Sequence, residues 1–205
     1  MQQKIFLRRV SSVTKYFLLF IFPLPVLLFA QASITSRGST YIQDFNSLAN
    51  SGSGNTWVNN TTVPGWYSSQ PVYSAGTGSS NSGTLYSFGS VASTERALGS
   101  LVSSTTGTIY FGIRLLNSTC NDLISFDISY TGEQWRNASN ASSQKLNFQY
   151  QVGATDLTSG TWIDLDALDF TSPQVSGLPN ALDGNDALNR MSISTTLSSI
   201  TLNPG

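Results

Sequence analysis

The sequence contains no histidine and only one cysteine, Cys120. Imidazole nitrogens and thiolates are the ligands that zinc, copper and non-haem iron sites depend on, so sites for these metals are excluded. A serine nucleophile would lack its usual imidazole base, and a lysine variant of that chemistry has only Lys145 beyond the N-terminal segment. Neither a GxxxxGK[ST] loop nor a dinucleotide fingerprint occurs. The sequence therefore predicts no cofactor, no metal and no acyl-transfer centre.

Charged residues are also few, with ten Lys and Arg against eleven Asp and Glu. Four of the basic residues lie within the first fifteen positions, and the other six are spread singly along the chain. A chain without a basic stripe cannot neutralise a row of phosphates, so nucleic acid is not expected as a partner. The six are Arg37, Arg96, Arg114, Arg136, Lys145 and Arg190.

Only one long hydrophobic run occurs, from Tyr16 to Ala30, and it follows the four N-terminal basic residues and leads into the small-residue end Ala30–Ala32. A membrane-spanning helix needs about 20 apolar residues. This run has fifteen residues and contains Pro23 and Pro25. We therefore predict a cleaved signal peptide over residues 1–32 and a secreted domain over residues 33–205. The domain is expected outside the cell or on its surface, or in the periplasm if export stops there, without membrane contact after cleavage.

A single cysteine excludes the several disulfide bridges that hold many small secreted domains together, so packing must stabilise residues 33–205 as one domain. Cys120 lies near Asn117 and Asn121, where a turn between strands is expected. Its thiol either pairs with another chain or remains unpaired and partly covered, and the second alternative is favoured.

Period-two alternation is the strongest pattern in residues 33–205. Residues 122–130, 145–153 and 108–116 each alternate between apolar and polar side chains, as half-buried antiparallel strands require. The predicted inward residues are Ile124, Phe126, Ile128 and Tyr130 in the first strand, Leu146, Phe148, Tyr150 and Val152 in the second, and Ile109, Phe111, Ile113 and Leu115 in the third.

Weaker strand patterns occupy residues 39–45, 84–89, 95–101, 161–166 and 191–202. Clusters of Ser, Asn, Gly and Thr between them are typical of turns, and helical periodicity is confined to a short turn near residues 165–170. Many short strands with hydroxyl-rich outer faces predict an all-β fold, an antiparallel β-sandwich of the jelly-roll kind.

Seven stretches in this order resemble a known group of proteins. They are QDFNSLANSGSGNTW, VPGWYSS, LYSFGS…STERALGSL, GTIYFGIRLLN, ISYTGEQWRN, FQYQVGA…LTSGTW and LDGNDALNR. Together they are similar to secreted β-sandwich modules of Bacteroidetes-type and other environmental bacteria. The resemblance implies a fold like the non-catalytic jelly rolls of carbohydrate-active proteins. It also implies a place beside nuclease-like or lamin-tail-like modules, or ahead of a C-terminal sorting tail, and no catalytic residues are established for the group that could be assigned to this chain.

The resemblance stops at SSITLNPG, residues 198–205. Members of the group continue with a leucine-arginine-tryptophan strand and an acidic, glycine-rich segment, whereas here the last three residues are a turn signal. We therefore expect one or two closing strands and a sorting tail to be missing. Such an incomplete C-terminus leaves an unpaired sheet edge, which invites association with other chains.

Glu133, Trp135 and Arg136 are an acid, a tryptophan and an arginine within four positions. At a strand end, the ring of Trp135 can stack on a sugar while Glu133 and Arg136 bond its hydroxyls. The favoured alternative is that Trp135 packs over the edge of the core and the charged side chains pair on the sheet surface. Trp66 and Tyr67, with Tyr73 nearby, form either a sugar platform or a cover for the core, and the sequence does not choose.

Carboxylates offer one route to catalysis, since a glycoside hydrolase needs two of them about 5 to 10 Å apart. Glu133 with Asp127 or with Glu95 is the candidate pair, and sequence spacing selects neither.

Calcium binds oxygen ligands, which Asp183, Asn185 and Asp186 supply around Gly184. The glutamate of an EF-hand loop is absent at the required offset, so an Asx turn is favoured there.

The sequence therefore predicts a non-catalytic module that binds a polysaccharide, a cell-surface glycan or another surface component, or that serves as an accessory structural domain. A carboxylate-based glycan hydrolase is the alternative. The candidate ligand-binding residues are Glu133, Trp135, Arg136, Trp66 and Tyr67.

Overall fold

The computed structural model describes residues 32–205, so the predicted signal peptide, except Ala32, lies outside the described residues. Within residues 32–205 the protein is all-β, as the sequence predicts, with several sheets of which none is closed. The exception to strand and loop is one 3₁₀ turn, η1 (Asp166–Leu168), in the segment where a short turn is predicted. No helix in this part of the chain has the length and apolar character to cross a membrane.

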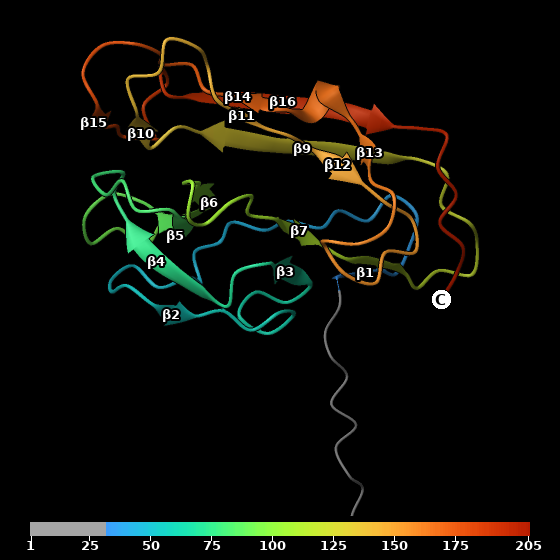
Figure 1. The fold of residues 1–205 in the computed structure, drawn as a ribbon. Helices are drawn as coiled ribbons and strands as arrows, with labels where there is room; N and C mark the ends of the chain where they lie inside the picture. Colours follow the sequence, from blue (N-terminus) through green and yellow to red (C-terminus); the bar gives the residue numbers. More distant parts are fainter. Residues whose placement is uncertain (1–31) are drawn as a thin grey trace, which may run out of the picture.

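The strands up to residue 117 form the lower layer in Figure 1. Strands β2 (Asn55–Thr56), β4 (Val72–Gly76), β5 (Thr84–Phe88) and β6 (Ala97–Leu101) form one sheet in that order. Strand β3 (Trp66–Ser68) pairs with β7 (Phe111–Ile113), and β1 (Ala32–Ile34) pairs with β8 (Leu115–Asn117). The pairs β1–β8 and β4–β5 are parallel, so the expectation of a purely antiparallel fold is wrong for these two pairs.

The strands from residue 126 onward form the upper layer (Figure 1). Strands β9 (Phe126–Glu133) and β16 (Arg190–Leu197) are antiparallel along their whole length. Three short antiparallel pairs accompany them. These are β10 (Arg136–Asn137) with β15 (Asn180–Ala181), β11 (Lys145–Leu146) with β14 (Phe170–Thr171), and β12 (Gln149–Tyr150) with β13 (Ile163–Asp164).

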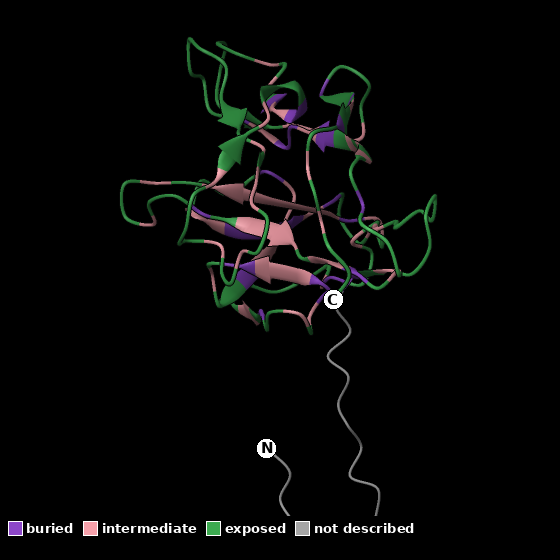
Figure 2. Cartoon of the chain, turned by 90° about the vertical axis from the view of Figure 1, so that its right-hand side faces the viewer, coloured by how far each residue is buried: buried purple, intermediate pink, exposed green. Residues whose placement is uncertain are grey.

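The alternation predicted for residues 122–130 is present from Phe126 onward. Phe126, Ile128 and Tyr130 are half-buried, whereas the residues between them are exposed. Ile124 is 62% exposed and was wrongly placed inward, because the strand begins only at Phe126 and Leu123 is buried instead. Figure 2 shows exposed residues concentrated in the loops around the strands.

Two other predicted strands differ from the structure. Residues 145–153 are divided between β11 and β12, which have different partners, and this break leaves the predicted inward residues Leu146 and Val152 40% and 48% exposed. Residues 39–45 form no strand, and Phe45 turns the backbone with a φ of 60°. The third predicted strand, residues 108–116, is divided between β7 and β8. Its four predicted inward residues are buried or half-buried, but Gly112 and Leu116 between and after them are half-buried too, so the alternation is only partial.

Two clusters of buried apolar residues are present, one in each layer. The lower cluster contains Leu48, Trp57, Val63, Tyr73, Leu85 and Ile109. The upper cluster contains Leu168, Phe170 and Ile193, with Ile128, Tyr130, Phe148 and Leu165 packed against it. A β-sandwich shares one core between two sheets, so the all-β class is confirmed and the jelly-roll sandwich is not.

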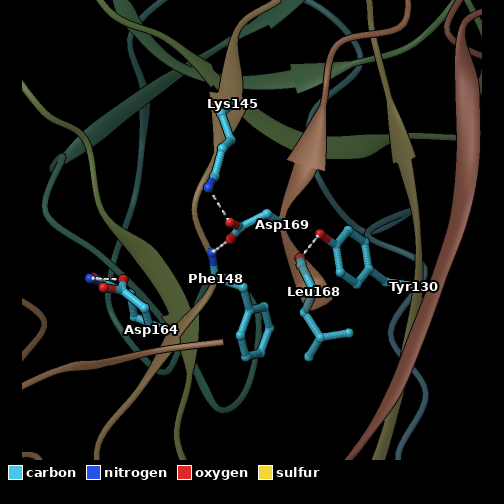
Figure 3. Close-up of polar contacts among 7 residues, drawn as sticks. Tyr130, Lys145, Phe148, Asp164, Leu168 and Asp169 are labelled. Carbon is cyan, nitrogen blue, oxygen red and sulfur yellow. Dashed lines mark hydrogen bonds and ion pairs between the residues drawn. The ribbon is translucent and has the colours of Figure 1, made fainter. Parts of the chain in front are cut away.

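An ion pair fixes the upper cluster at its edge (Figure 3). Lys145 Nζ lies 2.5 Å from Asp169 Oδ2, and the amide of Phe148 donates to Asp169 Oδ1 at 2.6 Å. Burial alone would raise the pKa of Asp169, but the bonds from Lys145 and Phe148 outweigh burial and lower it. The neighbouring Tyr130 hydroxyl donates to the Leu168 carbonyl, and burial, helped by the charge of Asp169, raises the pKa of Tyr130 to about 12.

Candidate functional site

The indole of Trp135 is buried, with 4% of its surface exposed. Its ring lies parallel to Phe88, with 6.2 Å between centroids, and Phe88 stacks in turn on Tyr86 at 4.8 Å. On Gly184 an added Cβ would lie 2.3 Å from the indole Nε1, so glycine is required there for the two segments to meet. These rings join β5 of the lower layer to the β9–β10 link of the upper layer, and they favour the packing interpretation of Trp135.

Glu133 and Arg136 are both hydrogen-bonded within the protein, Glu133 to the Trp135 indole and Arg136 to a loop of the lower layer. The indole Nε1 of Trp135 donates to Glu133 Oε2 at 2.8 Å. Arg136 Nη1 donates to the carbonyls of Gly78 and Ser79 at 3.1 and 3.2 Å, which ties the loop after β4 to the upper layer. The charged side chains therefore satisfy groups of the protein itself, and ligand binding by the three residues stays a prediction.

Glu133 lies near two other carboxylates, Glu95 and Asp183, whose charges affect its pKa. Burial raises the pKa of Glu133, and the nearby charges of Glu95 and Asp183 raise it further, while the Trp135 bond and Arg190 oppose the change. Glu95 itself accepts a hydrogen bond from Asn185 Nδ2 at 2.8 Å.

The structure distinguishes between the two candidate carboxylate pairs. Asp127 and Glu133 lie six positions apart on the same strand, which places their Cα atoms about 20 Å apart and excludes them as a hydrolase pair. Glu95 is close enough for its charge to raise the pKa of Glu133, so Glu95 with Glu133 remains a candidate hydrolase pair.

Two open hollows lie on the β9–β16 ribbon, and neither Glu95 nor Glu133 lines either of them. One is lined by Thr131, Ala187, Arg190, Met191 and Ser192, and the other by Asp127, Ile128, Ser129, Ser194, Thr195 and Thr196. Neither hollow brings two carboxylates together, so neither has the donor set of a glycoside hydrolase.

The predicted aromatic residues Trp66 and Tyr67 are neighbours on β3, so their side chains point to opposite sides of the strand. Trp66 lies edge to face with Phe45, with 4.7 Å between ring centroids, and its Nε1 donates to the hydroxyl of Tyr41 at 3.0 Å. The backbone of Tyr67 is opposite Gly112 in the β3–β7 ladder, and Tyr73 is buried in the lower cluster. The three rings therefore do not form one platform.

Tyr41 is the residue that the sequence did not indicate. Its ring is 37% exposed beside the half-buried Trp66, and its hydroxyl lies 3.3 Å from Gln43 Oε1. A local pattern could not have paired residues 41 and 66, because their contact depends on the turn at Phe45 and on the position of β3. Tyr41 and Trp66, which we call the aromatic pair, are the candidate ligand surface.

The loop around Gly184 is organised by Asx turns, as favoured. Asp183 Oδ1 accepts the amide of Asn185 at 3.0 Å, and Asp186 Oδ1 accepts the amide of Leu188 at 2.9 Å. Over residues 32–205, no group of three or more His, Cys, Asp or Glu side chains is arranged to hold a metal ion. Cys120 is free and exposed, so the prediction that its thiol is partly covered is wrong.

No family model, curated protein or solved structure matches this chain.

Proposed function

We propose that this chain is a secreted, non-catalytic β-sandwich module of the jelly-roll kind that binds a polysaccharide or a cell-surface glycan through the aromatic pair. The resemblance to bacterial accessory modules supports this class of function.

The observation that carries the proposal is the arrangement of Tyr41 and Trp66. Sugar rings bind where an aromatic face lies beside a few hydrogen-bonding groups. The Trp66 N–H is held by the Tyr41 hydroxyl, and Gln43 supplies a further polar group beside the exposed ring. Because these contacts exist within the protein alone, little further side-chain conformational freedom is lost when a ligand binds. Ile42, which is 81% exposed, adds apolar surface next to the pair.

Retention on a panel of immobilised polysaccharides tests this proposal. Tyr41→Ala removes the exposed ring, and we expect retention to fall by roughly twofold to tenfold, since one aromatic contact contributes roughly 0.5 to 1.5 kcal/mol beyond its buried area. Tyr110→Ala is the matched control, because Tyr110 is 41% exposed and lies outside the aromatic pair. Equal retention of the two variants and the unmodified protein would contradict the proposal.

A glycan hydrolase is the second candidate, and the crowding of Glu133 and Glu95 favours it. A raised pKa suits a carboxyl group that acts as general acid beside a second, ionised carboxylate. Release of reducing ends from a polysaccharide, lost in Glu133→Gln, would establish this alternative.

A further inference from the structure

We propose that the outer edge of β16 pairs antiparallel with β16 of a second copy of this chain, which joins two β9–β16 ribbons into one four-stranded sheet about a two-fold axis.

The β9–β16 ribbon is open at its edges. Within residues 32–205 the sheet has only these two strands, and their backbone ladder runs from Arg190 opposite Glu133 to Leu197 opposite Phe126. Each outer edge therefore presents a row of backbone groups over eight residues. Such an edge is a template for another strand unless charge, proline or a bulge protects it.

Charge distinguishes the two edges. Strand β9 carries Asp127 and Glu133 near its two ends. Antiparallel self-pairing of β9 would bring Asp127 of one copy toward Glu133 of the other, and like charges across strands are destabilising. Strand β16 has no carboxylate, and Arg190 at its first position is its only charge. Residues 191–197 contain no proline and no glycine, so nothing in them opposes pairing.

The sequence of β16 suits a second copy of itself. A two-fold axis through Ser194 pairs residues that point to the same face, because the paired positions are always an even number of residues apart. Ser192 then lies opposite Thr196 on the hydroxyl face. Met191, which is 43% exposed in the single chain, lies opposite Leu197 on the other face, where Leu197 is already buried at 6% exposure. Hydroxyl pairs such as Ser192 with Thr196 stabilise an antiparallel ladder.

Cysteine cross-linking tests this register directly. Ser194→Cys, in a Cys120→Ser background that removes the exposed native thiol, places two thiols at the axis, where opposite Cβ atoms lie about 4.5 to 5.5 Å apart. Ser129→Cys is the matched control, since Ser129 is the direct partner of Ser194 and is also exposed. Across four strands, two copies of residue 129 lie about 14 Å apart, beyond the reach of a disulfide.

We expect the purified Ser194→Cys protein to form a disulfide-linked dimer under mild oxidation at least about tenfold faster than the Ser129→Cys protein. Equal rates of cross-linking, or no dimer from either protein, would overturn the proposal.

Sedimentation equilibrium gives a second test without a covalent bond. Two lysines at the axis oppose each other directly, so Ser194→Lys should weaken self-association about fivefold, whereas Ser129→Lys should change it less than about twofold. Circular dichroism checks that both proteins fold. A protein that stays monomeric at millimolar concentration would contradict the paired edge, and so would equal weakening by the two lysines.

Discussion

Replacing Trp135 by alanine removes the ring that joins the two layers. Its burial at 4% exposure and its stacking on Phe88 predict a loss of about 3 to 5 kcal/mol in the free energy of unfolding, the range for large aromatic side chains in a core. The change also removes the hydrogen bond to half-buried Glu133, which contributes about 1 kcal/mol and overlaps with the packing loss. We expect a total near 4 kcal/mol, a large part of the stability of a single domain.

Urea unfolding followed by far-ultraviolet circular dichroism measures this loss without relying on tryptophan fluorescence. Trp162→Ala is the control, because the indole of Trp162 bonds the Ser159 carbonyl in an exposed loop. We expect the control to lose less than about 1 kcal/mol. At this chain length, 4 kcal/mol lowers the melting temperature by roughly 8 to 16 °C.

The result that would refute this reasoning is specific. If Trp135→Ala unfolds at the same urea concentration as the unmodified protein but is no longer retained on glycan, the indole is a ligand platform and the packing interpretation is wrong.

Three further predictions concern single side chains. Because the pKa of Asp169 is lowered, its ionised form stabilises the fold above about pH 4, the ordinary value of an unfolded aspartate, and this contribution is lost as pH falls through the folded pKa. Asp169→Asn should therefore lower the urea midpoint at about pH 7 and have little effect near pH 2, and an equal effect at both would contradict it. The pKa of Glu133 is raised, so its ionised form opposes folding, and Glu133→Gln should raise the midpoint at about pH 7 and lose that advantage below about pH 4. Gly78→Ala should lower the free energy of unfolding by more than about 2 kcal/mol, because Gly78 has a φ of +79° and an added Cβ would lie 1.6 Å from the Trp135 carbonyl oxygen. Gly54→Ala is the control, since Gly54 has a similar φ but open space around it, and it should lose about 1 kcal/mol. Equal melting temperatures of the two variants would refute the steric argument.

The sequence predicted the overlapping parts of β9 and β16, residues 126–130 of the predicted 122–130 and residues 191–197 of the predicted 191–202, because each strand buries one face and exposes the other. Ile128 and Tyr130 alternate with exposed Ser129, and Ile193 alternates with exposed Ser192 and Ser194. An uninterrupted period of two is the signal that local side-chain chemistry can carry.

The two-residue strands were not predictable in the same way. Strands β10 and β15 pair with each other although they are far apart in the sequence. Nearby, Gln134 donates a hydrogen bond to the Gln174 carbonyl at 2.9 Å, across forty positions of sequence. A two-residue strand has no periodicity to read, and its partner is set by tertiary contacts. The parallel pairing of β4 with β5 has no local signal for the same reason.

The candidate site was predicted only in part. Trp66 was identified from its aromatic, glycine-bounded setting, but Tyr41 was assigned to a strand that does not form. The burial of Trp135 depends on Phe88 and Gly184, which lie 47 and 49 positions away in the sequence. The local sequence shows that an aromatic ring is present, but it does not show which distant residues will cover that ring.

Incubating the purified protein with each polysaccharide that retains it, and measuring bound protein and reducing ends in the same sample, is the most direct test of a binding module without catalysis. We expect saturable retention that depends on Tyr41 and no increase in reducing ends over the polysaccharide alone. An increase that Glu133→Gln abolishes, while retention persists, would contradict the proposed function.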